Sequence, residues 1–591
     1  MPPRRGGPFS AGTRHQYPVT RVLATTAVLA AAGVASVLAM LPPARLVLAP
    51  PWNDGTIPGL LHVHTNRSDG RLPPEVVAER AARAGLRFLI FTDHGAGTRT
   101  PDPPTYRSGV LCLDAVEIST TGGHYLALDM DVAPYPLGGE ARDVVEDVRR
   151  LGGFGVAAHP DSPKEDLSWR EWAAPIDAVE IINPDTSWRS RLAAAQWRAR
   201  LSLLSALFTY PMRPTETIAA LLTDATASLA AWDKLIEHRP VVALAGVDAH
   251  EKLELRNGDP GTLRYALPLP SYENSFRTLS LRVRPDEPWR GDALADARVL
   301  MRAFRAGHIY TVIDGWATAP AFEFTATHGG GTAQAGDEIP GRGPVTLNVR
   351  ASLPPGYSVT VWQGSHALVT GRRDMSFAVP IGDASGVYRA DVRSDERPNG
   401  PPWILSNPIY VRRAAESPPT VPPSRVANSR PLSDGRSIAG WSVEHDRTSV
   451  AVLEASPRVG GNDLRLRFGL SGGSIVGQFA SAVVEVPAGI ASYDRLQFRA
   501  RAERPMRVSV QVRAEVAGVG RRWQRSIYIE STEHDRAVMF RDMTPVDGTG
   551  PSSPPLAEVR SLLFVVDTTN TAPGASGRVW LSDPRLERLA N

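Results

Sequence analysis

Residues 60–64 read Leu-Leu-His-Val-His, and residues 88–94 read Phe-Leu-Ile-Phe-Thr-Asp-His, so each stretch is an apolar run that ends in histidine. Three later apolar runs end in a similar way, in Val116-Glu117, in His159-Pro160 and in Asp248-Ala249-His250. Short, continuously apolar runs are typical of strands that are buried on both faces. The repeated pattern predicts several such strands, each followed by polar side chains.

Helical patterns lie between these predicted strands. Pro73 and Pro74 open one helix, Glu75 falls in its first turn, and Gly85 closes it, which is the usual polarity of helix signals. Strands that alternate with helices predict parallel β pairing. From about residue 58 to 317 we therefore expect an α/β unit, specifically a distorted (β/α) barrel with one crowded mouth.

The polar residues after the strands form one set of candidate metal ligands. Carboxyl ends of strands converge at one rim in barrels and in open α/β sheets, and active sites form there. His62 and His64 are two residues apart, so on an extended strand both would point to the same face, and Asp248 and His250 repeat that spacing. The full set is His62, His64, Asp69, His94, Glu117, His124, His159, Asp248 and His250.

The donor types narrow the choice of metal. Cys112 is the single cysteine in the chain, which excludes an internal disulfide framework and a thiolate-rich zinc site. Imidazole and carboxylate ligands suit zinc, manganese and iron. A carboxylate such as Glu117 can bridge two ions, and paired ions are suited to phosphoryl chemistry. The cluster therefore predicts an enzyme that uses several divalent metals.

Six motifs in this order resemble those of the polymerase and histidinol phosphatase family, known as the PHP domain. They are His62-Val63-His64-Thr65, Ser68-Asp69-Gly70, Thr92-Asp93-His94, Glu117-Ile118-Ser119, His159-Pro160 and Asp248-Ala249-His250. The resemblance covers residues 58–317. It implies a distorted (β/α)7 barrel, a site for three divalent metal ions (manganese, zinc or iron) and phosphoesterase activity in which a metal-bridging hydroxide attacks phosphorus.

The resemblance also implies how the ligands divide among three ions. His62, His64, Glu117 and Asp248 would surround the first ion, Glu117, His124 and His159 would hold the second, and Asp69, His94 and His250 would hold the third. We expect Asp93 to orient His94. Two further residues are candidates for contact with substrate: Arg67, either a phosphate ligand or a solvated loop charge, and Asn183, either an orienting group or a turn residue.

Beyond residue 317 the pattern changes to short strand-like runs divided by Gly and Pro, which is typical of β-sandwiches. We expect a small sandwich over 318–413, a Pro-rich linker over 414–433 and a jelly-roll of the galactose-binding type over 434–591. Trp441, Trp523 and Trp580 of the last domain are candidates for a glycan-binding face, although core positions are the simpler interpretation.

The amino terminus predicts membrane association. Residues 1–21 form a basic tail, and residues 22–41 are a charge-free apolar stretch long enough to span about 30 Å of hydrocarbon as a helix. Most nearby arginines precede the stretch, so the positive-inside rule places the amino terminus in the cytoplasm and the rest of the chain outside it. The alternative is a signal peptide whose cleavage removes residues 1–39, in which case the protein is secreted.

These features predict a membrane-anchored, extracytoplasmic phosphoesterase that hydrolyses phosphomonoesters or phosphodiesters. Its substrate would be a phosphorylated small molecule or an envelope component, with a glycan as a second ligand of the last domain. The alternative is a non-catalytic envelope- or carbohydrate-binding protein on a PHP scaffold, and hydrolysis of a non-phosphate substrate is a third option. The formal net charge of only +3 gives no support for a nucleic-acid partner.

Overall fold

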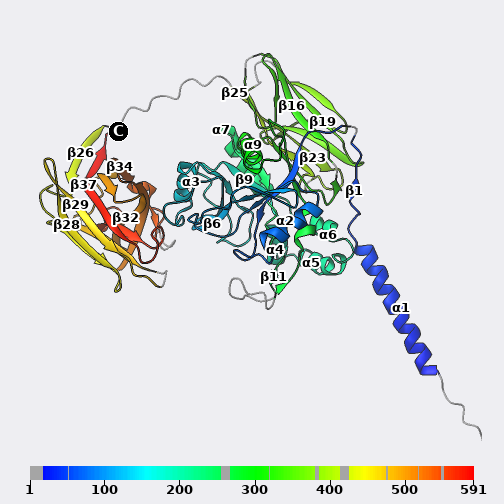
Figure 1. Ribbon diagram of the computed structural model, residues 1–591, viewed down its shortest axis with the longest axis horizontal. Helices are drawn as coiled ribbons and strands as arrows, with labels where there is room; N and C mark the ends of the chain where they lie inside the picture. The colour runs from blue at the N-terminus through cyan, green and yellow to red at the C-terminus, as the bar shows by residue number, and fades with distance from the viewer. Residues whose placement is uncertain are drawn as a thin grey trace, which may run out of the picture.

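The computed structural model describes residues 17–50, 52–254, 266–318, 320–341, 343–379, 385–398, 400–412, 425–473, 477–516, 518–546 and 551–590. Helix α1 (Tyr17–Met40) projects from a central unit, and a separate β-rich unit of residues 425–590 lies on the far side of that unit (Figure 1). Residues Val22–Met40 of α1 are exposed and, by length and composition, sufficient to cross a membrane. This helix fits either a membrane anchor or a signal sequence.

The chain that follows α1 is held against the central unit. Strand β1 (Leu46–Val47) pairs in parallel with β15 (Ala317–Thr318). The backbone N–H of Leu46 donates to the carbonyl of Trp316 (2.9 Å), and that of Leu48 donates to the carbonyl of Thr318 (3.1 Å). The connection from α1 into the first strand of the site is therefore tied to the surface.

Seven strands carry or flank the candidate ligands. They are β2 (Ile57–Val63), β3 (Phe88–Phe91), β6 (Val116–Thr120), β7 (Gly123–Leu128), β8 (Phe154–Ala157), β9 (Ala178–Ile182) and β10 (Val242–Ala245). Strands β6 to β10 form one sheet in the order β10-β9-β8-β7-β6, and β2 and β3 lie side by side in another. Most of these strand residues are buried, in agreement with the apolar runs of the sequence.

Backbone contacts join the two sheets at both edges. At one edge Val63 bridges to Ala249, and the N–H of His64 donates to the carbonyl of Ala249 (3.1 Å). At the other edge His94 bridges to Glu117, and the N–H of Gly95 donates to the carbonyl of Glu117 (3.0 Å). The strands thus follow one another in a ring, and the segments that carry the ligands meet at one end of it.

The expectation of parallel pairing throughout is wrong for part of this ring. Strands β2–β3, β8–β9 and β9–β10 are parallel, as expected, but β6–β7 and β7–β8 are antiparallel. The physical reason is the short turn between β6 and β7, since a turn of this length can join only antiparallel strands. Gly123 allows the tight approach there, because it has φ +109° and a Cβ would lie 2.4 Å from the carbonyl oxygen of Ser168.

Helices cover the outside of the strands. The helix predicted from Pro73, Pro74 and Gly85 is α2 (Pro74–Arg83), which packs against β3 and β5 (Val110–Asp114). Helix α3 (Ala141–Arg150) packs against β7 and β8, α7 (Thr226–His238) against β9, and α9 (Ala293–Ala306) against β5 and β13 (Ser280–Val283). The apolar core therefore lies between the strands and these helices.

Residues 318–412 form a β-rich unit that continues the central one. A four-stranded sheet has the order β17-β16-β19-β22 (Gly331–Gln334, Phe322–His328, Val345–Ala351, Met375–Val379). The other strands include β23 (Gly386–Ser394) and β24 (Ile404–Ser406), and β24 pairs with β14 (Ile309–Val312) of the central unit. The buried amide of Asn407 also bonds to the backbone of Ala243. Hydrogen bonds thus cross the boundary expected near residue 317.

Residues 425–590 form two antiparallel sheets of six strands each. One contains β28-β29-β37-β31-β34 with β26 added to β37, and the other has the order β27-β30-β36-β32-β33-β35. Strand bounds are β26 (Val426–Pro431), β27 (Trp441–His445), β28 (Val450–Arg458), β29 (Gly461–Gly469), β30 (Phe479–Glu485), β31 (Arg495–Ala502), β32 (Met506–Val516), β33 (Val519–Ile529), β34 (His534–Met539), β35 (Thr544–Pro545), β36 (Val559–Asp567) and β37 (Ser576–Leu589).

Two expectations about this unit change. The Pro-rich linker expected over 414–433 is too long at its carboxyl end, because β26 pairs with β37; residues 414–424 lie outside the described residues. Trp441 and Trp523 are buried core residues, and Trp580 lies beneath the guanidinium of Arg501, 3.9 Å from its ring centroid. The three tryptophans do not form one exposed face.

An ionic cluster fixes this unit to the central one. The guanidinium of Arg507 on β32 donates to Asp147 of α3 (2.8 Å) and lies 3.1 Å from Asp143. Arg525 of β33 donates to Asp143 and Glu146. Arg507, Asp143 and Asp147 are all buried, so the contact is part of the folded structure and not a surface ion pair.

Candidate metal centre

All nine candidate ligands meet at one end of the strand ring. Four groups of them have ligand atoms within 4.8 Å of one another, namely His64, Asp69, His94 and His250; His62, His64 and Glu117; His62, His159 and Asp248; and His94, Glu117 and His124. The groups share members, so they form a single cluster. Residues up to 188 positions apart in the chain thus become neighbours.

Glu117 lies at the centre of the cluster. One carboxylate oxygen, Oε1, accepts from Nδ1 of His124 (2.7 Å) and from Nε2 of His159 (3.1 Å). The other, Oε2, lies 3.1 Å from Nε2 of His64 and 3.4 Å from both Nε2 of His62 and Nδ1 of His94. A carboxylate that faces five imidazoles is placed to bridge metal ions.

Asp248 gives the cluster a second buried carboxylate. Its Oδ1 lies 3.3 Å from Nε2 of His62, 3.4 Å from Nε2 of His64 and 3.6 Å from Nδ1 of His250. His62 and His64 therefore stand between Glu117 and Asp248. The four side chains that the resemblance assigns to a first ion are thus neighbours in the structure.

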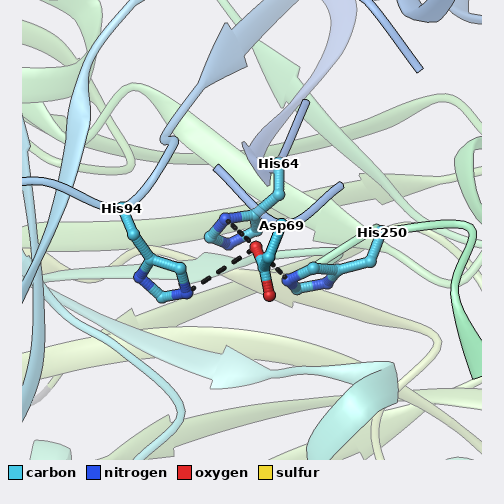
Figure 2. A group of neighbouring side chains, drawn as sticks. All are labelled: His64, Asp69, His94 and His250. Atoms are coloured by element: carbon cyan, nitrogen blue, oxygen red, sulfur yellow. Dashed lines mark ion pairs between the residues drawn. The ribbon is translucent and has the colours of Figure 1, made fainter. Parts of the chain in front are cut away.

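Asp69 forms the outer part of the cluster, shown in Figure 2. Its Oδ1 lies 3.2 Å from Nε2 of His250, 3.5 Å from Nδ1 of His64 and 3.8 Å from Nε2 of His94. The side chains of His94 and Asp69 are 36% and 29% exposed, whereas those of His62 and His64 are fully buried. The cluster is therefore closed to solvent at His62 and His64 and open at Asp69 and His94.

The division of ligands differs in two ways from the one that the resemblance implies. His64 groups with Asp69, His94 and His250 as well as with Glu117. His159 groups with His62 and Asp248 while also bonding to Glu117. Nδ1 of His64 faces Asp69 whereas its Nε2 faces Glu117 and Asp248, so His64 belongs to two of the groups.

The backbone brings the histidines together in an unexpected way. His62 has φ +64°, and the β2–β3 register shifts between Leu60 and Val63, so the backbone at His62 departs from the regular extended strand that the spacing predicts. His159 (φ +29°) and Asp248 (φ +48°) also lie in the left-handed region. Such conformations are costly for residues other than glycine and cluster at functional sites.

The electrostatics of the cluster favour positive charge. Burial disfavours a charged ring at His64, but the nearby carboxylates of Asp248 and Glu117 outweigh it and raise the pKa of His64 to about 10. At His62 burial also disfavours the charged ring, but the charges of Asp248, Glu180 and Glu117 outweigh it and raise the pKa. Burial raises the pKa of Glu117, but His62, His124 and His159 outweigh it and hold that pKa well below the usual range. Protons on the imidazole rings or bound metal cations supply the positive charge that these buried carboxylates favour.

The buried nitrogens fit metal ligation. Nε2 of His62, both ring nitrogens of His64 and Nδ1 of His159 are buried without a hydrogen-bond partner within the described part of the chain. Buried polar atoms without partners are rare, because leaving them unsatisfied is costly. Neutral imidazole beside carboxylate is a donor set for zinc, manganese or iron. The residues present therefore fit divalent metal ions.

Glu180 is a member of the site that the sequence pattern did not reveal. It is buried on β9, where Oε1 accepts from Nδ1 of His62 (2.8 Å) and Oε2 accepts from the backbone N–H of His159 (2.7 Å). A carboxylate that bonds to the remote nitrogen of a ligand histidine fixes the ring and its tautomer. The one available signal was an acidic residue inside the apolar run 178–182.

Asp93 acts on a different segment from the one expected. Its carboxylate accepts from the backbone N–H of Thr65 (2.7 Å), the hydroxyl of Thr65 (2.7 Å) and the hydroxyl of Ser68 (2.7 Å). It therefore braces the turn between His64 and Asp69 and not the ring of His94. The expectation failed because the β2–β3 pairing places Asp93 beside this turn.

Asn183 and Arg67 are both engaged with the protein. Asn183 caps α4 (Pro184–Ala193) by accepting from the N–H of Thr186 (2.9 Å), and its amide donates to Glu180 (3.0 Å). Arg67 pairs with Asp102 and with Asp114 (3.3 Å). Asn183 thus supports Glu180, and Arg67 would have to exchange carboxylate partners to hold a phosphate.

Comparisons with known proteins give partial matches. No protein-family model matches the chain. A stretch of 108 residues, 17% of the chain, is 32% identical to a 3',5'-nucleoside bisphosphate phosphatase of Chromobacterium violaceum and spans 38% of that protein's length. Another of 138 residues, 21% of the chain, is 28% identical to an uncharacterised protein of Methanocaldococcus jannaschii and spans 80% of it. The chain thus has distant phosphatase similarity over part of its length.

Solved structures similar to this chain include carbohydrate-binding modules of Clostridium thermocellum. A family 11 module is 17% identical with a TM-score of 0.24, and the match covers 28% of this chain and 97% of the module. A family 30 module is 13% identical with a TM-score of 0.21, and the match covers 28% of this chain and 99% of the module.

Proposed function

We propose that this protein is a metal-dependent phosphoesterase of the PHP type. The observation that carries the proposal is Glu117, which lies 2.7–3.4 Å from nitrogens of five histidines. The distant phosphatase similarity supports hydrolase activity at a coarse level. We further propose that the ring β2-β3-β6-β7-β8-β9-β10 is the distorted (β/α)7 barrel of that family.

Residues of the cluster would have separate roles in metal binding, in positioning the metal ligands and in substrate approach. His62, His64, His94, His124, His159, His250, Asp69, Glu117 and Asp248 would hold up to three divalent ions, of manganese, zinc or iron. Ions bound there would activate water for attack on phosphorus and stabilise the charge that develops on the phosphoryl oxygens. Glu180 and Asp93 position the ligands, and the substrate approaches over His94 and Asp69, the exposed side of the cluster.

We propose that α1 anchors the protein in a membrane with the metal centre outside the cytoplasm. The support is the apolar span Val22–Met40 and the arginines that precede it. The substrate would then be a phosphorylated small molecule or an envelope component, either a monoester or a diester. Glycan binding by residues 425–590 is an additional proposal, suggested by the sandwich fold alone.

The test is direct. Purified full-length protein should contain divalent metal by inductively coupled plasma mass spectrometry and should hydrolyse p-nitrophenyl phosphate or bis-p-nitrophenyl phosphate with added manganese. We expect His62→Ala to lower turnover by about 100-fold or more, because this ligand lies between both buried carboxylates. His534→Ala, on the half-exposed surface of the last unit, is the matched control and should retain activity. Folded wild-type protein without metal or turnover would overturn the proposal.

A further inference from the structure

Helix α5 (Trp197–Thr209) exposes large apolar side chains to solvent. Trp197 is 64% exposed, Leu204 is 54% exposed and Phe208 is 60% exposed, and Leu201 and Leu207 of the helix and Met212 just after it are exposed as well. Positions 197, 201, 204 and 208 are three or four residues apart, so these side chains form one stripe along the helix. A contiguous apolar stripe of this kind marks a surface that is covered in the working protein.

All charged residues in the segment around α5 are basic. Between residues 186 and 213 the sequence contains five arginines and neither aspartate nor glutamate. Arg198 and Arg200 flank the apolar stripe on either side of the helix and are exposed. Apolar and aromatic residues on one face with arginines beside them are the pattern of helices that lie in the surface of an anionic membrane.

The structure places α5 where α1 ends. α1 contacts α5, and the guanidinium of Arg213, just after α5, donates to the carbonyl of Pro42, just after α1. The backbone N–H of Arg45 also lies 3.3 Å from the carboxylate of Glu216 in α6 (Pro214–Leu221). Figure 1 shows α5 and α6 at the edge of the central unit from which α1 departs.

We infer that α5 lies in the surface of the bilayer that α1 crosses, with Trp197, Leu201, Leu204 and Phe208 among the lipids. The inference rests on α1 being a membrane-spanning helix and not on the hydrolytic chemistry. A spanning helix must meet the membrane surface where it ends, and the apolar stripe is beside that end. The occupant is therefore lipid, and the arginines face the anionic headgroups.

The test uses full-length protein, verified by intact mass to retain residues 1–41, in vesicles of phosphatidylcholine and phosphatidylglycerol. Leu204→Cys is labelled with the fluorophore NBD in a Cys112→Ala background, since Cys112 is the single native cysteine. Val459→Cys, at a position 98% exposed in the last unit, carries the control label. We expect nitroxide-labelled lipids to lower emission at position 204 at least about twofold and to leave position 459 unchanged.

Two outcomes would overturn the inference while leaving the anchor intact. One is a label at position 204 that aqueous iodide quenches as strongly as the label at 459. The other is a label shielded from iodide yet unaffected by nitroxide lipids, which would mean that protein covers the helix. As a second measurement, the NBD label is placed at Met212→Cys. Nitroxide lipids should no longer quench this label when the double substitution L201E/L204E is added. They should still quench it in the control L294E, since Leu294 is exposed on α9.

Discussion

At the scale of single residues, the cluster is a set of charges that the surrounding protein holds in fixed orientation. Glu180 bonds to Nδ1 of His62 and to the backbone of His159, and Asn183 bonds to Glu180. The ligand atoms thus depend on a buried row of supporting groups behind them. This support should matter nearly as much as the ligands themselves.

Replacing Glu180 tests that dependence. Glu180→Gln keeps the volume and one acceptor but removes the charge that holds His62, so we expect metal affinity to fall by about 10–100-fold. Isothermal titration of the metal-stripped protein with Mn²⁺ measures this. Glu165→Gln, at a side chain 85% exposed, should bind metal like the wild type. Unchanged affinity in the Glu180 variant would show that His62 is held by other contacts.

Metal binding should release protons. The carboxylates raise the pKa of His62 and bring that of His64 to about 10, so both rings keep their protons to higher pH than a free imidazole in the metal-free protein. An imidazole nitrogen must lose its proton before it binds a metal, so apparent affinity should rise as pH increases from about 6 to 8. Titrations in buffers of different ionisation enthalpy count the protons released. Affinity independent of pH would contradict this account.

At the scale of elements, the approach of β9 to the end of β10 leaves no room for a side chain at position 246. A Cβ there would lie 1.5 Å from Oε1 of Glu180 and 3.0 Å from Cβ of His62. We expect Gly246→Ala to displace Glu180, to destabilise the fold by about 1–3 kcal/mol and to weaken metal binding. Gly329→Ala meets nothing within 4 Å and serves as the control. Thermal unfolding and metal content together check the result, and two indistinguishable variants would refute it.

The sequence was sufficient to predict the apolar strands and the histidines and carboxylates that cluster after them. It was not sufficient to predict their local geometry. The left-handed backbone of His62 and the antiparallel β6–β7 pair arise from strand packing and from a short turn, neither of which a residue spacing reveals. Glu180 was missed for the same reason, since its role depends on β9 lying behind His62 and His159.

At the scale of the whole molecule, Arg507 connects the last β unit to α3. Its guanidinium is buried with Asp143 and Asp147, so removing it would take a buried cationic partner from two buried carboxylates. We expect Arg507→Ala to cost about 3–5 kcal/mol and to lower the midpoint of thermal unfolding. Arg501→Ala, on the outer surface over Trp580, should change the midpoint little. Calorimetry distinguishes the two, and equal midpoints would show that other contacts hold the interface.

The sequence pattern predicted where the α/β region gives way to all-β regions, but not how these regions contact one another. The change near residue 317 is visible in the sequence, yet the pairing of β14 with β24 continues one sheet across it. The ionic contact of Arg507 with α3 joins residues more than 350 positions apart, which no local pattern predicts. Long-range pairing of this kind is a property of the assembled fold.

The pairing of β1 with β15 determines how far the metal centre can travel. A domain on a loose tether explores a volume whose radius grows with the length of the tether. Here only residues 41–45 separate α1 from β1, and β1 is hydrogen-bonded to the central unit. With α1 in a membrane, the metal centre is therefore held at a fixed distance from the bilayer surface, because no flexible linker allows it to move away. Substrates must reach that height themselves, by lateral diffusion within the bilayer or by arrival at its surface.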